Sequence, residues 1–157
     1  MHNQPKYRLD YAPIRLPADF PITRPGIHRQ KDTPITALHL HDNLEVGYCY
    51  SGSGIFVVEN KVFSFRAGDV NVINEREVHL AQSTAGTVSE WAFAALDPVG
   101  LLGAKEDDTC LLETASLCGP EFCNILAGRK HPDIAQTVRV LIEELRCGRS
   151  GWRSAVR

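Results

Sequence analysis

Short runs of apolar and β-branched residues follow one another through the middle of the chain, from Ile35 to Leu96. Turn-forming segments rich in Gly, Ser, Asn and Asp separate these runs. Strands of this length, at this regular spacing, are typical of an antiparallel sandwich or a small barrel, whose interior can hold one small ligand. The pattern predicts strands at 35–41, 44–50, 55–59, 62–66, 69–73, 78–82 and 88–96.

The segments on either side of this β-rich region lack its regular pattern. Residues 1–32 contain five prolines, which remove backbone hydrogen-bond donors, so we expect an irregular N-terminal arm there. Residues 98–118 mix a short apolar patch with an acidic loop, and they leave room for one more strand near Leu111. The predicted barrel therefore extends over residues 33–118.

A helix is predicted to begin after His131, because Pro132 suits a first helical position and Asp133 suits the first turn. Gly148 and Gly151 end it. Its apolar residues recur at spacings of three and four, and they either pack on the chain's own barrel or form a dimer interface. The residues of this stripe are Ile134, Val138, Leu141, Ile142 and Leu145.

Length and composition favour one domain with an appendage. The chain has 157 residues, of which 43% are hydrophobic, and two full domains would be cramped in that length. It has no apolar stretch of membrane-spanning length and no apolar signal-peptide block, so we expect a cytoplasmic protein without membrane contact. Its five cysteines form no C-x-x-C pair, which favours reduced thiols over disulfides.

Charge is distributed unevenly along the chain, although the net charge is only −2. Residues 32–127 contain 4 Lys and Arg against 14 Asp and Glu, whereas both ends of the chain carry an excess of basic residues. A nucleic-acid interface requires basic residues gathered on one face, and an acidic body repels phosphate. These residues alone are therefore poor candidates for binding DNA.

Three imidazoles and one carboxylate recur at a spacing that allows them to converge: His39, His41, Glu45 and His79. Alternate residues of a strand face the same way, so His39 and His41 project together. Imidazole and carboxylate ligands suit divalent transition metals, with zinc or nickel preferred here and iron or manganese as alternatives. The competing interpretation is a hydrogen-bonded polar cluster that contacts an organic effector.

The residues around these ligands resemble the two sequence motifs of the cupin superfamily. The first reads H-x-H-x3-E-x6-G from His39 to Gly52, and the second reads G-x10-H from Gly68 to His79. The second motif departs from the family pattern, because residues 74–76 replace a usual Pro-x-Gly turn and Ser83 replaces a common Asn. This resemblance implies a mainly β fold, a cupin-like double-stranded β-helix or jelly-roll barrel, followed by a C-terminal helical segment.

A larger part of the chain, roughly 35–150, resembles the N-terminal domain of AraC-family transcriptional regulators. The resemblance rests on the cupin motif, on the run from Trp91 to Pro98, and on the helix that follows His131. It implies a barrel that binds a small effector, a helical dimerisation segment at 119–150, and a DNA-binding domain with two helix-turn-helix motifs. That last domain is absent from this chain, and we expect residues 151–157 to begin the linker toward it.

These observations predict the ligand-sensing and dimerisation domain of an AraC-type regulator rather than an enzyme. The expected partners are a small-molecule effector and a second copy of the chain, with DNA bound only through the missing domain. The rival hypothesis is a stand-alone metal-dependent cupin enzyme, such as a dioxygenase or an isomerase. Candidate effector-binding residues are Tyr48, Trp91 and Phe93, and candidate residues of the dimer helix are Val138, Leu141, Ile142 and Leu145.

Overall fold

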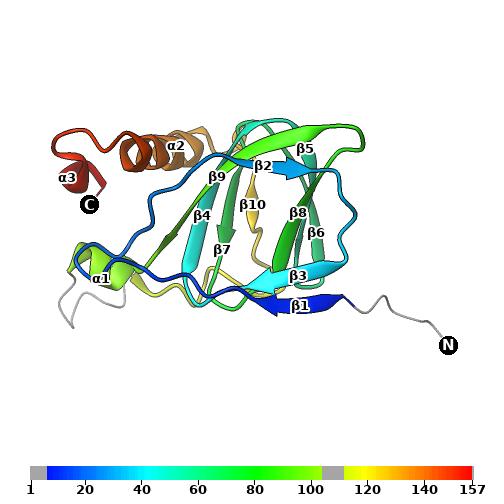
Figure 1. Cartoon of the computed structure of the whole chain (residues 1–157), viewed down its shortest axis with the longest axis horizontal. Helices are drawn as coiled ribbons and strands as arrows, with labels where there is room; N and C mark the ends of the chain where they lie inside the picture. Colours follow the sequence, from blue (N-terminus) through cyan, green and yellow to red (C-terminus); the bar gives the residue numbers. More distant parts are fainter. Residues whose placement is uncertain (1–6, 104–111, 157) are drawn as a thin grey trace.

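A computed structural model of the chain describes residues 7–103 and 112–156. Two five-stranded sheets face each other, and helices lie at one end and on the outer side of one sheet (Figure 1). The first sheet has the strand order β1 (Arg8–Tyr11), β3 (Ala37–Leu40), β8 (His79–Ser83), β5 (Ser53–Val58) and β6 (Lys61–Arg66).

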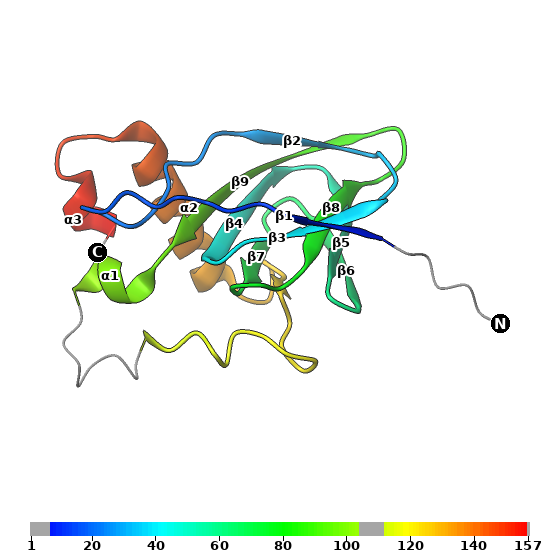
Figure 2. The same ribbon diagram turned by 60° about the horizontal axis from the view of Figure 1, so that its bottom comes forward.

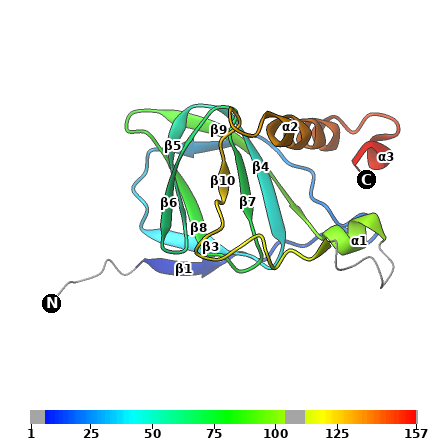
Figure 3. The same ribbon diagram turned by 180° about the vertical axis from the view of Figure 1, so that it is seen from behind.

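Figure 3 shows the second sheet from behind the view of Figure 1. Its strand order is β10 (Ile125–Leu126), β7 (Val70–Ile73), β4 (Leu44–Ser51), β9 (Val88–Leu96) and β2 (His28–Lys31). All pairings are antiparallel except that of β1 with β3, which is parallel. The β-sandwich confirms the predicted cupin-like fold class, although the two sheets are not joined into one closed barrel.

The strands predicted between Ile35 and Leu96 are all present, with ends that differ by at most two residues. The prediction of an irregular arm over 1–32 is wrong for part of that segment, because β1 and β2 lie within it. Both are four-residue strands at sheet edges, where few side chains are buried, so the sequence has little apolar pattern there. The strand expected near Leu111 lies outside the residues that the structure describes.

The space between the sheets is filled by large apolar side chains from both of them. Alternate residues of β4 and β9 point inward, so Cys49 and Trp91 meet Phe56 and Phe65 of the opposite sheet. The Trp91 ring stacks on Phe93 at a centroid distance of 5.4 Å and meets Phe65 edge-on at 5.0 Å. This cluster fills the interior at one side of the polar residues described below and supports them with rigid aromatic packing.

The other face of the second sheet is covered by helix α2 (Pro132–Cys147), as Figure 2 shows from the side. Val138, Ile142 and Leu145 of this helix are buried against the chain's own sheet and N-terminal segment. Of the predicted dimer-helix residues, only Leu141 is partly exposed. Leu145 is fully buried, and in this conformation the helix stripe packs on its own subunit.

The helical region is also shorter than the predicted segment 119–150. Residues 119–131 form turns and β10, and α2 begins at Pro132 as expected. Two further short helices are present, α1 (Pro98–Leu102) and α3 (Trp152–Val156). Arg24 donates from Nε to the carbonyl of Leu145 at 3.0 Å and so satisfies the C-terminal end of α2.

Two turns explain how the motif residues are held. Gly52 adopts a φ of 86°, and a Cβ there would lie 2.7 Å from the Ser89 backbone, so the motif glycine is needed at this turn. Arg76 adopts a φ of 63° in the segment where the usual Pro-x-Gly turn is missing. The turn therefore forms without that signature.

In the described residues, no helix is long and apolar enough to cross a membrane.

Candidate metal centre

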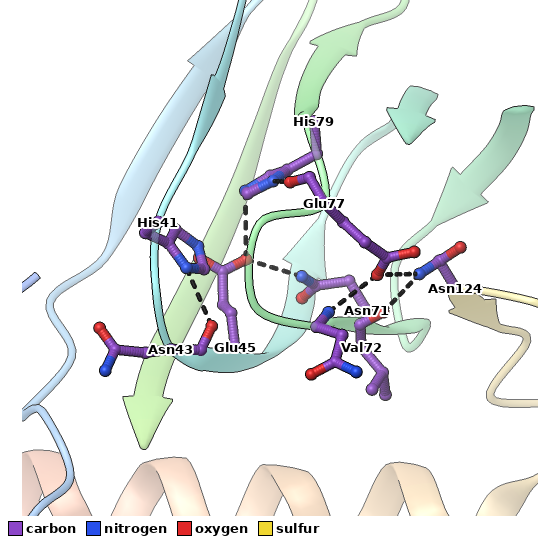
Figure 4. A network of polar contacts seen from close by, with 9 residues as sticks. His41, Asn43, Glu45, Asn71, Val72, Glu77, His79 and Asn124 are labelled. Atoms are coloured by element: carbon purple, nitrogen blue, oxygen red, sulfur yellow. Dashed lines mark hydrogen bonds and ion pairs between the residues drawn. The ribbon is translucent and has the colours of Figure 1, made fainter. Parts of the chain in front are cut away.

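Three of the four predicted ligands converge inside the sandwich: His41, Glu45 and His79 (Figure 4). His41 follows the end of β3, Glu45 is the second residue of β4, and His79 is the first residue of β8. One ligand atom from each lies within 4.8 Å of the others, and all three side chains are buried. The two sheets thus bring together residues separated by up to 38 positions.

Both imidazoles of this group are oriented by backbone carbonyl groups. Nδ1 of His41 donates to the carbonyl oxygen of Asn43 at 3.0 Å, and Nδ1 of His79 donates to that of Glu77 at 2.8 Å. These bonds leave Nε2 of each ring as the atom that faces the centre. The arrangement matches the outer hydrogen bonds that fix the tautomer of metal-binding histidines.

The two Nε2 atoms are buried and have no hydrogen-bond partner. Nε2 of His41 lies 3.3 Å from a carboxylate oxygen of Glu45, and Nε2 of His79 lies 4.0 Å from the other oxygen. A buried polar atom without a partner destabilises a fold, so such atoms persist mainly where something else binds them. A divalent cation between the three side chains would satisfy both nitrogens, and the donor set therefore fits a metal.

Asn71 positions the carboxylate. It lies fully buried on β7, and its Nδ2 donates to Oε1 of Glu45 at 2.8 Å. Gly47, which pairs with Asn71 across β4 and β7, leaves the space that this side chain needs. A Cβ at position 47 would lie 2.1 Å from Oδ1 of Asn71. The sequence did carry a signal for Asn71, since it is a lone amide within the apolar run Val70–Ile73.

Electrostatics keep the carboxylate ionised. Burial alone would raise the pKa of Glu45, but the two imidazoles and the Asn71 amide outweigh it and lower that pKa. Burial likewise opposes protonation of His41, yet Glu45 and the Asn43 carbonyl raise its pKa above the ordinary value. Burial lowers the pKa of His79, which keeps this imidazole neutral. The lowered pKa of Glu45 keeps its charged carboxylate available to a cation.

A second polar network holds the backbone from which His79 projects. The buried carboxylate of Glu77 accepts from the backbone N–H of Asn74 at 2.8 Å and from Nδ2 of Asn124 at 3.0 Å. Nζ of Lys61 donates to Oδ1 of Asn124 at 2.6 Å. Sequence reasoning missed Asn43 and Glu77. Their backbone carbonyls orient the rings of His41 and His79, and because every residue type has such a carbonyl, the sequence gives no sign of this role.

His39 stands apart from the three converging ligands. It pairs with His79 across β3 and β8, and their ring centroids are 4.2 Å apart. Its ring centroid is 6.3 Å from that of His41, and it is not a member of the group within 4.8 Å. Burial, together with the adjacent His79, lowers the pKa of His39 to about 4. The structure thus unites three of the four predicted ligands and leaves the fourth beside them.

A cavity of about 550 Å³ adjoins the centre, and we call it the His39 cavity. Such a volume is within the range of small-molecule sites. Its polar lining consists of His28, Gln30, His39, Glu45 and His79. Its apolar lining includes Ile27, Phe56, Leu80 and Phe93.

The three predicted effector-binding residues differ in their relation to this cavity. Phe93 lines it. Trp91 points into the same interior but is fully buried behind Phe93 and does not line the cavity. Tyr48 lies on the opposite face of β4, where it packs with Tyr50 in the layer under α2. Strand alternation thus places Tyr48 outside the sandwich, away from the His39 cavity.

A second cavity, of about 620 Å³, lies near the start of α1. Its lining includes the carboxylates of Asp19, Asp42, Glu75 and Asp97. It contains none of the three converging ligands, and we assign the site to the smaller His39 cavity because Glu45 and His79 line that one.

The sequence matches the AraC-like ligand binding domain over residues 25–155. The chain belongs to this family. The match covers β2 through most of α3 and so includes the three converging ligands, the His39 cavity and the covering helix. The family thus agrees with the resemblance inferred from the sequence, and it describes a domain that binds a ligand. A comparison with curated proteins finds no match.

Solved structures with some similarity to the AraC-like domain include cupin proteins of low sequence identity. A Cupin 2 conserved barrel domain protein from Salinispora arenicola CNS-205 is 14% identical, with a TM-score of 0.44 and 63% of this chain and 89% of that chain covered. A cupin protein from Bacteroides fragilis is 16% identical, with a TM-score of 0.42 and coverage of 45% and 62%. A predicted oxalate decarboxylase from Thermotoga maritima is 24% identical, with a TM-score of 0.33 and coverage of 45% and 53%.

Proposed function

We propose that this AraC-like domain senses a small molecule in the His39 cavity and that a divalent transition metal, bound by His41, Glu45 and His79, is part of the sensing site. The observation that carries the proposal is the pair of buried, unpartnered Nε2 atoms that face one carboxylate. Zinc, nickel, iron and manganese all accept this donor set. We prefer zinc or nickel, with iron or manganese as alternatives.

Residues around the site would hold the three metal ligands in position. The carbonyls of Asn43 and Glu77 hold the Nδ1 protons and aim both Nε2 atoms inward. Asn71 holds Glu45 in place. When bound, the metal would supply a Lewis-acidic centre for an oxygen atom of the effector. The aromatic and aliphatic wall of the cavity would exclude water from that contact.

The proposed regulator acts as a dimer in the cytoplasm and binds DNA through a domain other than this one. The acidic balance of residues 32–127 disfavours phosphate contact by the sensor itself. Ile134 and Val140 are exposed apolar residues of α2 and offer a surface for a second copy. We expect Val140→Glu to shift a dimer to a folded monomer in light scattering at tens of micromolar. A monomeric unmodified chain would contradict the dimer.

One observation supports a second candidate function. Two histidines and one carboxylate that leave coordination positions open are also the ligand set of non-haem iron oxygenases. The iron-loaded chain would then consume oxygen in the presence of an organic substrate. The sensor proposal predicts no such consumption at enzymatic rates, and an oxygen electrode distinguishes the two.

The direct test of the sensor has two readouts. Elemental analysis of protein purified without chelator should find about one transition-metal ion per chain. A thermal-shift screen with small organic molecules should then find a compound that raises the melting temperature, because a ligand of the folded state stabilises it by mass action. A chain that holds no metal, even after incubation with zinc, nickel, iron or manganese salts, would contradict the metal proposal.

A further inference from the structure

His39 lines the cavity but lies outside the group of converging ligands. The ligand atoms of His41, Glu45 and His79 are within 4.8 Å of one another, and His39 is not part of that set. Its ring instead packs against the ring of His79 at 4.2 Å. The two rings are tilted by 59° to each other, and His39 is a neighbour of the cluster.

The ring nitrogens of His39 make no hydrogen bond within residues 7–103 and 112–156. The two other polar side chains on this part of the cavity wall are already engaged, since His28 Nε2 and Gln30 Oε1 are hydrogen-bonded to each other at 3.0 Å. His39 is only half-buried and borders the open space. His39 is therefore a polar side chain on the wall whose ring nitrogens can bind an incoming molecule.

We propose that His39 binds the ligand of the cavity and leaves the metal to His41, Glu45 and His79, and that this ligand is a small carboxylic acid with an apolar body. The proposal rests on the proposed metal centre. It assigns His39 a role different from that predicted by its position in the H-x-H motif.

Charge favours an acid. Glu45 is the one carboxylate among the residues that line the cavity in the described part of the chain. A divalent cation beside a single carboxylate leaves a net positive charge, whereas the metal-free cavity has the negative charge of Glu45. An anionic oxygen is therefore attracted to the loaded centre and repelled by the empty one. A second oxygen of the same carboxylate can accept the ring N–H of His39.

The wall favours an apolar body over a sugar. Ile27, Phe56 and Phe93 present carbon surfaces to the cavity. A polyhydroxylated ligand would bury several hydroxyl groups here, and each buried hydroxyl without a partner costs about 1–3 kcal/mol. The bond between His28 and Gln30 occupies one polar atom of each and so reduces the number of partners left for such hydroxyl groups. A compact acid with an aromatic or aliphatic body needs no further partners.

Calorimetry on the full chain with benzoate, phenylacetate, acetate, benzamide and glucose tests the proposal. We expect at least one acid to bind the zinc-loaded chain, and at least about ten-fold more weakly once zinc is removed by a chelator, since about 1.4 kcal/mol corresponds to a ten-fold change. Benzamide, which has the shape of benzoate without its charge, and glucose should bind at least about ten-fold more weakly than the best acid.

Two variants separate the roles of the histidines. His39→Ala should weaken acid binding by about 10- to 100-fold, the range of one lost hydrogen bond to a charged group, while zinc affinity changes by less than about three-fold. His39→Gln keeps a donor and should restore part of the acid affinity. Circular dichroism confirms the fold of each variant.

Each contrary result identifies a different failure. Loss of zinc from His39→Ala to the degree seen in His41→Ala would make His39 a metal ligand and overturn this inference, while the metal centre itself would stand. Equal binding of benzamide or glucose, or no binding of any acid at millimolar concentration, would overturn the ligand class. A wild-type chain that binds no zinc, nickel, iron or manganese would instead overturn the proposed function on which the inference rests.

Discussion

The two faces of strand β4 differ in what they bury. Glu45, Gly47 and Cys49 point between the sheets, whereas Val46 and Tyr48 point outward under the helices. The outer face is a continuous apolar layer completed by Ile142 and Leu145 of α2. The inner face places ionisable groups and unpartnered nitrogens in the interior. A single strand thus stabilises the fold on one side and arranges candidate chemistry on the other.

This difference separates stability from function. Apolar burial on the outer face stabilises the domain by about 25 cal/mol for each Å² removed from water. The buried polar groups of the inner face work in the opposite direction, because unpartnered donors and acceptors destabilise a fold unless a ligand satisfies them. Substitutions on the outer face should therefore lower stability, and substitutions on the inner face should lower metal affinity with a smaller effect on stability.

The largest expected effect is on the outer face. Leu145 is fully buried among Phe20, Ile22 and Leu101. Leu145→Glu should destabilise the chain by more than about 4 kcal/mol, because it removes apolar contacts and buries a carboxylate. Urea unfolding followed by circular dichroism measures this loss. Leu141→Ala, at a partly exposed site of the same helix, is the control and should cost less. A folded, monomeric Leu145→Glu protein would show that the residue belongs to an interface instead.

An intermediate effect is expected at Gly47, on the inner face. An alanine Cβ would approach Asn71 Oδ1 to 2.1 Å and Phe93 Cδ1 to 2.5 Å, so Asn71 must move away from Glu45. We expect Gly47→Ala to weaken zinc binding by about 10- to 100-fold, the usual effect of losing a group that orients a ligand. Competition with a chromophoric chelator measures the affinity. Gly26→Ala is a matched control on the same cavity wall, where an added Cβ meets nothing within 4 Å.

The smallest effect concerns acid stability. The pKa of His39 is lowered to about 4 by burial and by the adjacent His79, from an ordinary value of 6.5. The unfolded chain therefore takes up a proton at this residue between about pH 6.5 and pH 4, and folding stability is lost as the pH falls through that window. Because the ring is half-exposed, solvent screening reduces the effect to about 1 kcal/mol.

Urea unfolding of metal-free protein at pH 7.5 and pH 5 checks this expectation. The wild-type chain should lose about 1 kcal/mol more than His39→Asn between the two values, because the variant has no group to protonate at that position. Equal losses would mean that the environment of His39 does not disfavour its charged form.

Much of the fold could be predicted from the sequence because the strands between Ile35 and Leu96 are long enough to show alternation. Strands β1 and β2 could not be predicted, since edge strands with exposed side chains carry no apolar pattern. The convergence of His41, Glu45 and His79 followed from motif spacing, but the departure of His39 depends on side-chain packing across β3 and β8. The outward position of Tyr48 depends on which face of β4 is inner, which alternation alone leaves open.

Cobalt(II) titration tests the central claim, that the inner-face cluster is a metal site, most directly. Cobalt reports its own ligands through visible absorption, and it accepts the same imidazole and carboxylate donors as zinc. We predict saturation at one cobalt per wild-type chain with a spectrum distinct from that of the hydrated ion, and the same spectrum for the control His131→Ala, whose histidine is exposed. His41→Ala should keep its circular dichroism and lose the spectrum. A hydrated-ion spectrum with the wild-type chain, or an unchanged spectrum in His41→Ala, would contradict the account.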